Sequence, residues 1–212
     1  MSGEARERQT TMCDEADKRF FNACAAYVRD IRGDASFTPW LLWMQSRCDP
    51  KSPMEKVFLA AFATVVEANT TIPLGKQIPS LNGTALRSGI GITPQRRFQD
   101  YKVDFWLEYW GDAVIVGGDG ESSNLVKPIR EFVVELDGHG FHDKDPEQRA
   151  YENKRKRALQ KAGYFVFPYT GKEVNFEPMV PAIECLAFLL GRPAESLACP
   201  DIKRKDREML SA

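Results

Sequence analysis

The sequence lacks an excess of charge of either sign. It has 29 Lys and Arg against 30 Asp and Glu, which gives a formal net charge of −1. A balanced chain has no overall field that draws it to nucleic acid, so any nucleic-acid-binding surface has to be local. Two local basic clusters are candidates: residues 149–157, which hold five basic residues, and residues 87–97.

Long apolar runs, a secretory signal and a cysteine framework are also missing. The longest apolar run, residues 57–66, is far shorter than the roughly 20 residues that span a membrane. The start of the chain has no apolar segment typical of a secretory signal. Five scattered cysteines are typical of reduced thiols in a cytosolic setting. We therefore expect a cytoplasmic protein with no membrane partner.

Zinc-binding patterns are absent as well: no Cys-x-x-Cys or His-Glu-x-x-His spacing occurs. Instead, two strand-like segments, residues 98–107 and 130–137, each place carboxylates among apolar residues. Acidic side chains avoid strand interiors because of both propensity and burial. Carboxylates in these positions therefore suggest a function.

The spacing of these carboxylates predicts that they converge. Side chains alternate across a strand, so Glu135 and Asp137 share one face and Leu136 lies on the other. Asp104 lies between Val103 and Phe105, so we expect it in a strand too. If the two strands pair, the three carboxylates meet. Oxygen ligands suit Mg²⁺ or Mn²⁺, which keep waters and bind a substrate phosphate.

Several linked motifs resemble one known family. They are Val-Asp-Phe at 103–105, Val-Val-Glu-Leu-Asp-Gly at 133–138, Phe-His at 141–142, a basic helix, and Gly-Tyr-Phe-Val-Phe at 163–167. Together they resemble the PD-(D/E)XK nuclease superfamily, and within it the branch around the very-short-patch mismatch repair endonuclease. The resemblance covers about residues 52–176. It implies a restriction-endonuclease-like fold and a metal-dependent endonuclease that hydrolyses DNA in repair, defence or a mobile element.

The resemblance also implies roles for individual residues. The metal, Mg²⁺ with Mn²⁺ as a substitute, would be held by Asp104, Glu135 and Asp137, with Glu55 in support from a helix. His142 would orient or deprotonate the attacking water. Phosphate contacts would come from Arg149, Lys154, Arg155 and Arg157. The chain departs from the superfamily at Asp137, where the motif has Lys, so the general base stays open between His142 and a relocated Lys.

Each of these residues also has a structural interpretation. Asp104 is compatible with a solvent-facing edge strand, and Asp137-Gly138 is a turn signal. Glu135 is compatible with a buried ion pair to an arginine of the 149–157 helix, because a buried carboxylate needs a compensating cation. Glu55 has the spacing of a capping-box partner of Ser52. The basic helix is compatible with a solvated face.

The pattern of elements predicts an α/β fold with a mixed central sheet flanked by helices. Helices are expected at residues 14–29, 52–69, 145–163 and 178–190, and strands at about 91–97, 99–108, 112–117, 130–137 and 164–169. We divide the chain into an N-terminal helical extension at 1–51, with 1–12 disordered and 34–51 irregular, a nuclease-like domain at 52–192, and a polar tail at 193–212.

Two other functions compete with the nuclease. One is a catalytically inactive nuclease-like fold that serves as a DNA- or protein-binding module. The other is a subunit of a larger assembly, in which Phe20, Phe21, Trp40 and Trp43 of the N-terminal extension dock a protein partner. Covering the main core is the commoner use of such aromatic residues. The sequence does not choose an oligomeric state.

Overall fold

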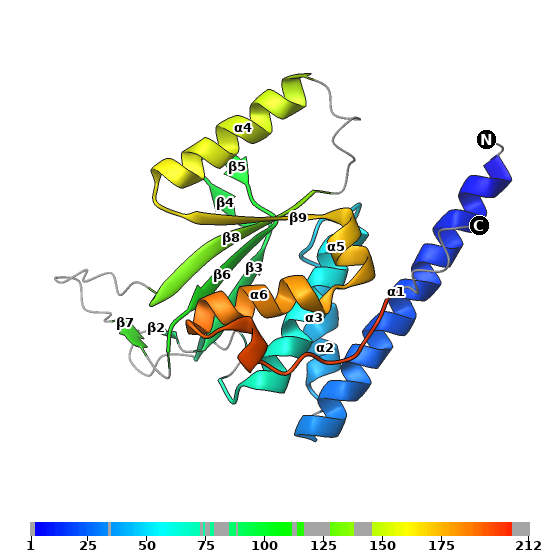
Figure 1. The fold of residues 1–212 in the computed structure, drawn as a ribbon, viewed down its shortest axis with the longest axis horizontal. Helices are drawn as coiled ribbons and strands as arrows, with labels where there is room; N and C mark the ends of the chain where they lie inside the picture. Colours follow the sequence, from blue (N-terminus) through cyan, green and yellow to red (C-terminus); the bar gives the residue numbers. More distant parts are fainter. Residues whose placement is uncertain are drawn as a thin grey trace.

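The computed structural model describes residues 3–33, 35–72, 74, 77–78, 85–87, 89–111, 114–116, 128–137 and 146–204. Its centre is a four-stranded mixed sheet with helices on both faces (Figure 1). This confirms the predicted α/β class with a mixed central sheet. Within the described residues, no helix has the length and apolar character needed to cross a membrane.

The central sheet has the strand order β3-β6-β8-β9. Its strands are β3 (Ile90–Pro94), β6 (Phe105–Tyr109), β8 (Arg130–Asp137) and β9 (Phe165–Thr170). The pairs β3–β6 and β6–β8 are antiparallel, whereas β8–β9 is parallel. A parallel neighbour needs a crossover connection, and helix α4 (Pro146–Lys161) lies in the segment between β8 and β9.

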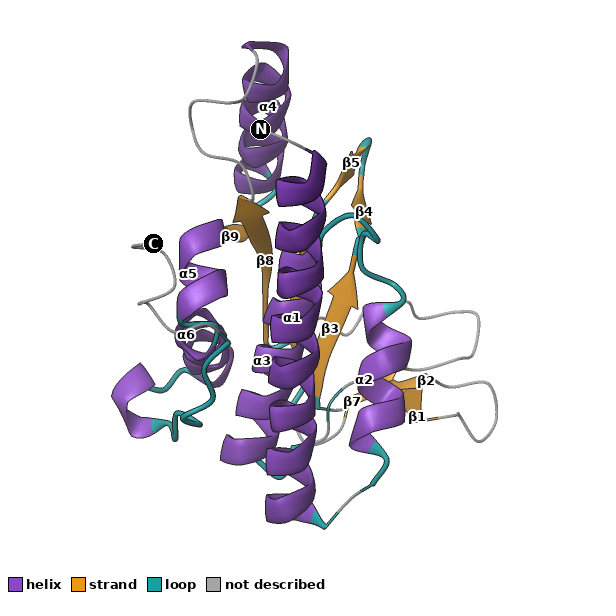
Figure 2. Cartoon of the chain, turned by 90° about the vertical axis from the view of Figure 1, so that its right-hand side faces the viewer, coloured by secondary structure: helices purple, strands orange, loops and turns teal. Residues whose placement is uncertain are grey.

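One face of this sheet carries most of the core. Helices α3 (Pro53–Asn69) and α6 (Met179–Leu190) pack together on it, and α1 (Gly3–Arg32) lies along α3 (Figure 2). The helix α3 begins with Ser52 as its N-cap and Pro53 in its first turn, both favourable at a helix start. It is buried along nearly its whole length, as its almost uniformly apolar sequence predicts.

The opposite face is covered by α4 alone among the described helices (Figure 1). Its apolar cluster is small, with four buried side chains: Val103, Trp106, Val133 and Leu159. The alternation along β8 explains this division, because Phe132 and Val134 join the large core while Val133 joins the small cluster. Glu135 has the same parity as Val133, which assigns it to the α4 side.

The other strands of the described residues form two smaller sheets. The first has the order β1-β2-β7 and consists of β1 (Gln77–Ile78), β2 (Ala85–Arg87) and β7 (Val114–Val116). The second is the hairpin of β4 (Arg97–Phe98) and β5 (Tyr101–Lys102). The predicted strand at 112–117 therefore belongs to a separate sheet, and the predicted strand at 99–108 is divided into β5 and β6.

Two predictions for the N-terminal part of the chain need correction. Helix α1 begins at Gly3 instead of residue 14, so it includes much of the segment expected to be disordered. Residues 34–51 are not irregular throughout, because α2 (Phe37–Gln45) forms there and buries Phe37, Leu41 and Met44. Its helical state follows from packing on α3 and not from the aromatic residues themselves, which are mediocre helix formers.

The predicted polar tail is partly folded onto the core. It contains a short 3₁₀ helix, η1 (Ala194–Ser196), and the buried side chain of Arg204. Arg204 Nε donates to Asp17 Oδ1 of α1 at 2.5 Å, and Arg204 Nη1 donates to Asn175 of α5 (Gly171–Phe176). A buried arginine needs such partners, so residues 193–204 are part of the fold; residues 205–212 lie outside the described part of the chain.

Candidate active site

Asp104 lies at an interruption of a long hairpin. The β3–β6 ladder ends at the Pro94–Phe105 pair, and the chain continues into the β4–β5 hairpin. At the interruption Gln95 has φ +53°, and its N–H donates to Asp104 O at 2.9 Å. Asp104 is thus immediately before β6 and not within a strand, which corrects the prediction. Asp104 has the same parity as Trp106, which belongs to the small cluster on the α4 side.

The carboxylate of Asp104 reaches β8. Its Oδ2 accepts a hydrogen bond from Leu136 N at 2.7 Å. Because Phe105 pairs with Val134 in the antiparallel register, the next residues on each strand are Asp104 and Glu135. Burial raises the pKa of Asp104, while the Leu136 N–H and the charge of Arg155 oppose that rise. The predicted convergence of these two acidic positions is confirmed.

Glu135 is a largely buried acid with little compensation. Both carboxylate oxygens lack solvent exposure, and apart from Arg155 no hydrogen-bond donor among the described residues reaches them. Arg155 of α4 forms an ion pair with Oε2. Burial first, and the charge of Asp104 second, raise the pKa of Glu135 to about 8 although Arg155 opposes the shift. The charge of Arg155 therefore acts on two neighbouring acids, Asp104 and Glu135, and opposes the rise in the pKa of each.

Arg155 is held in place from a second side. Its Nη1 donates to Lys102 O of β5 at 3.0 Å, while its other terminal nitrogen pairs with Glu135. The fork of an arginine suits such a two-sided contact. This confirms the ion pair that the structural interpretation of Glu135 required. It also joins α4, the β4–β5 hairpin and β8 at one point.

Glu55 lies at the start of α3, and its carboxylate accepts hydrogen bonds from residues outside the helix. Ser52 Oγ accepts from the backbone N of Glu55 at 3.4 Å, which is the N-cap bond. The carboxylate Oε2 instead accepts from Asp49 N at 2.9 Å and from Gln95 Nε2 at 3.1 Å. Burial raises the pKa of Glu55 to about 7, and the charge of Asp104 adds to the rise. These contacts therefore do not favour a capping-box role for the Glu55 carboxylate.

Asp137 ends β8, two residues beyond Glu135, opposite Thr170 in the parallel register. Its charge contributes to the raised pKa of Asp104. We refer to Glu55, Asp104, Glu135 and Asp137 as the acidic cluster. His139 and His142 lie outside the described residues. Within the described ranges, no three His, Cys, Asp or Glu side chains are arranged to hold one metal ion.

Of the four basic residues predicted to contact phosphate, one faces the acidic cluster. Arg155 pairs with Glu135, whereas Arg149, Lys154 and Arg157 are exposed on α4. In the second basic region, Arg96 forms an ion pair with Glu108 at 2.8 Å, and its guanidinium lies 4.1 Å from the Trp106 ring centroid. Arg96 therefore has structural partners of its own.

Asp49 is a member of the site that the sequence did not indicate. Its backbone N–H donates to Glu55, and its charge raises the pKa of Asp104. Its side chain accepts from Lys51 N at 2.8 Å, which is an ordinary turn contact. The local Cys-Asp-Pro sequence gives no signal beyond that turn. Gln95, which follows β3, is the second contact of Glu55.

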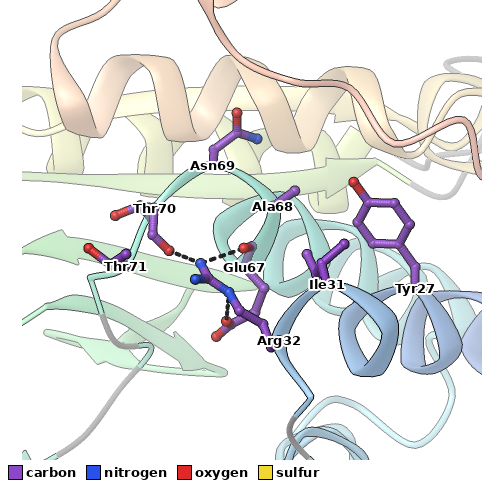
Figure 3. A pocket seen from close by; sticks show the side chains of 8 residues that line it. All are labelled: Tyr27, Ile31, Arg32, Glu67, Ala68, Asn69, Thr70 and Thr71. Carbon is purple, nitrogen blue, oxygen red and sulfur yellow. Dashed lines mark hydrogen bonds and ion pairs between the residues drawn. The ribbon is translucent and has the colours of Figure 1, made fainter.

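A hollow of about 330 Å³ lies elsewhere, where α1 and α3 end (Figure 3). Arg32 lies in it, donating to Glu67 O at 2.6 Å and to Thr70 O, and forming an ion pair with Glu67 Oε2 at 3.2 Å. These contacts satisfy carbonyls at the end of α3. The hollow shares no lining residue with the acidic cluster, and its arginine has a structural role.

Comparisons with protein-family models, with curated proteins and with solved structures find no match for this chain.

Proposed function

We propose that the protein is a metal-dependent endonuclease that hydrolyses phosphodiester bonds in DNA, built on a restriction-endonuclease-like fold. The observation that carries this proposal is the buried Glu135 beside Asp104, with Arg155 as its close cationic partner. Burying two neighbouring carboxylates is costly without further positive charge. Strongly perturbed acids of this kind gather at functional sites.

The chemistry of the donor atoms suits a hard divalent cation, while the described side chains do not form a closed set of three ligands. Asp104 and Glu135 offer carboxylate oxygens, and Asp137 ends β8 two residues beyond Glu135. Magnesium, with manganese as a substitute, prefers such oxygen ligands. When bound, the cation would stabilise negative charge on the phosphate and increase the acidity of a coordinated water. Glu55 would support the site from α3.

The remaining roles fall to the chain's own side chains. Arg155 brings a positive charge to the acidic cluster, where it would also stabilise charge that develops on a phosphate. Arg149, Lys154 and Arg157 would hold the nucleic-acid backbone along α4. His142 is proposed to orient or deprotonate the attacking water, a task that suits an imidazole near neutral pH.

A cleavage assay tests this function. Supercoiled plasmid and single-stranded DNA are incubated with Mg²⁺, Mn²⁺ or EDTA, and the products of the wild type, Asp104→Ala and Glu135→Ala are compared. We expect metal-dependent cutting that falls by at least roughly a hundredfold in each variant, since each loses a proposed metal ligand. Glu147→Ala, at an exposed acid of α4, is the matched control. Undiminished cleavage by both cluster variants contradicts the proposal.

A second candidate is a nuclease-like binding module without catalysis. Two observations favour it: Arg155 already compensates part of the charge of Glu135, and Asp137 stands where the superfamily motif has Lys. Among the aromatic residues proposed to dock a protein partner, Phe20 of α1 is buried, whereas Trp43 of α2 is 56% exposed. A docking role for the N-terminal extension therefore falls to α2. DNA binding without cutting under any metal supports this candidate.

A further inference from the structure

A pair of tyrosines joins α4 to the β4–β5 hairpin. The rings of Tyr101 and Tyr151 lie edge to face, with centroids 5.5 Å apart. Tyr151 nevertheless remains 47% exposed, and neither tyrosine belongs to the small apolar cluster that packs α4 on the sheet. Part of the Tyr151 side chain is therefore open to solvent where α4 contacts the β4–β5 hairpin.

Positive charge surrounds this aromatic pair. Lys102 follows Tyr101 on β5, and Lys154 is three residues beyond Tyr151 on α4; both are exposed. Helix α4 as a whole contains six basic and two acidic residues. Three acids, Asp100, Glu147 and Glu152, also lie near the pair in sequence. The basic excess therefore belongs to α4 as a whole, and the two exposed lysines are the basic residues nearest the pair in sequence.

Arg155 connects the region of the two tyrosines with the acidic cluster. Arg155 is one helical turn from Tyr151, so both side chains project from the same side of α4. Arg155 also donates to Lys102 O, next to Tyr101, and pairs with Glu135. A nucleic-acid strand lying on the tyrosine pair would therefore have its backbone close to the acidic cluster.

We propose that Tyr101 and Tyr151, with Lys102 and Lys154, bind an unpaired nucleobase of single-stranded DNA beside the acidic cluster. This inference rests on the proposed function and names its substrate class. Aromatic side chains stack on any base, and flanking basic residues follow the backbone. Bases in an intact duplex are already stacked on their neighbours, so they cannot offer a free face to these tyrosines.

Binding measurements without hydrolysis test the inference. Fluorescence anisotropy compares a labelled single-stranded oligodeoxynucleotide, the same sequence as a duplex, and an abasic strand of equal length, in EDTA and in Ca²⁺. The wild type is expected to bind the strand with bases about tenfold or more tightly than the abasic strand. Equal affinity for the two strands overturns the inference without depending on any variant.

Variants of Tyr151 separate stacking from packing. Tyr151→Leu keeps an apolar contact with Tyr101 but removes the aromatic face, so single-strand affinity should fall about tenfold. Tyr151→Phe keeps the ring and should stay within about twofold of the wild type. Tyr101→Leu should reproduce the loss, and thermal unfolding verifies that each variant is folded. Glu195→Gln, at an exposed acid of η1, is the matched surface control.

The outcomes distinguish this inference from the proposed function. If Lys154→Gln weakens binding but Tyr151→Leu and Tyr101→Leu do not, the stacking inference is wrong while nucleic-acid binding stands. If the wild type binds neither strand nor duplex in EDTA or Ca²⁺, both the inference and the proposed function are wrong. Loss of single-strand binding in both leucine variants, with duplex binding unchanged, supports the inference.

Discussion

The two faces of the central sheet differ in how they are built. The face under α3 and α6 is covered by long apolar helices, and its core extends outward to α1 and α2. The α4 face has four buried apolar side chains, and a charged pair, Glu135 and Arg155, lies on the same side. One face stabilises the domain, and the other holds ionisable groups in positions that cost stability.

This difference shows how the fold can tolerate the acidic cluster. Buried acids with raised pKa values disfavour folding when they ionise. The large apolar core around α3 and α6 offsets that cost. Sites that trade stability for function are expected where local rules are broken.

The first experiment removes one buried side chain from each face. Phe58 stacks with Phe62 and Phe105 in the large core, whereas Leu159 belongs to the small cluster. Phe58→Ala should lower the free energy of unfolding by about 3–5 kcal/mol, and Leu159→Ala by about 2–3 kcal/mol. Urea unfolding measures both. A larger loss from Leu159→Ala contradicts the assignment of stability to the α3 face.

The second experiment follows the pH dependence of stability. The pKa of Glu55 is raised from 4.5 to about 7. Below 4.5 the carboxyl is protonated in both the folded and the unfolded states. Between 4.5 and about 7 the unfolded state ionises first, so the free energy of unfolding falls as the pH rises, and above 7 this effect is complete.

The variant Glu55→Gln should remove this part of the pH dependence, which we expect to be on the order of 1–3 kcal/mol. Its amide oxygen can still accept the hydrogen bonds from Asp49 N and Gln95. Urea unfolding at pH 4.5 and pH 8 measures the difference for the wild type, for Glu55→Gln and for the exposed control Glu147→Gln. Asp104 and Glu135 also have raised pKa values and leave part of the slope in the variant; a slope as large in Glu55→Gln as in the wild type shows that the Glu55 carboxylate does not contribute.

The third experiment tests the ion pair across the α4 face. Arg155→Gln removes the cation that stabilises ionised Glu135, whose pKa is about 8. At pH 9 the free energy of unfolding should fall by about 1–2 kcal/mol, less than for a fully buried pair because Arg155 retains some exposure. At pH 6, where Glu135 keeps its proton in the folded state, the loss should be smaller. Arg157→Gln, at an exposed position, provides the comparison; equal losses at both pH values argue against the charge as the cause.

Regular elements with strong periodicity were predictable. The prediction for residues 130–137 coincides with β8, and those for 164–169 and 178–190 differ by about one residue from β9 and α6. The glycine at the end of α6, Gly191, has φ +65° and ends the helix as its position in the sequence indicated. Such elements are specified by alternation, helical spacing and caps, which are local.

Elements that depend on a neighbour were not predictable. The short helix α2 was missed, since short helices gain most of their stability from tertiary packing. The helix α5 was also missed, although its capping box of Thr170 and Glu173 is a local signal. The contacts of Arg204 with Asp17 and Asn175 join distant parts of the chain. The interruption at Gln95 and Asp104 has no simple turn signal, because the β3–β6 and β4–β5 ladders continue in one register on either side of it.

The sequence alone determined the α/β class, the strand that carries Glu135 and Asp137, and the acidic character of the candidate site, because these follow from periodicity and residue type. Only the tertiary structure decided which groups meet. It joined Asp104 to Leu136 N, Glu135 to Arg155, and Glu55 to Asp49 and Gln95. Those contacts, and the burial that raises the pKa of Glu55, Asp104 and Glu135, arise between segments that local sequence cannot place together.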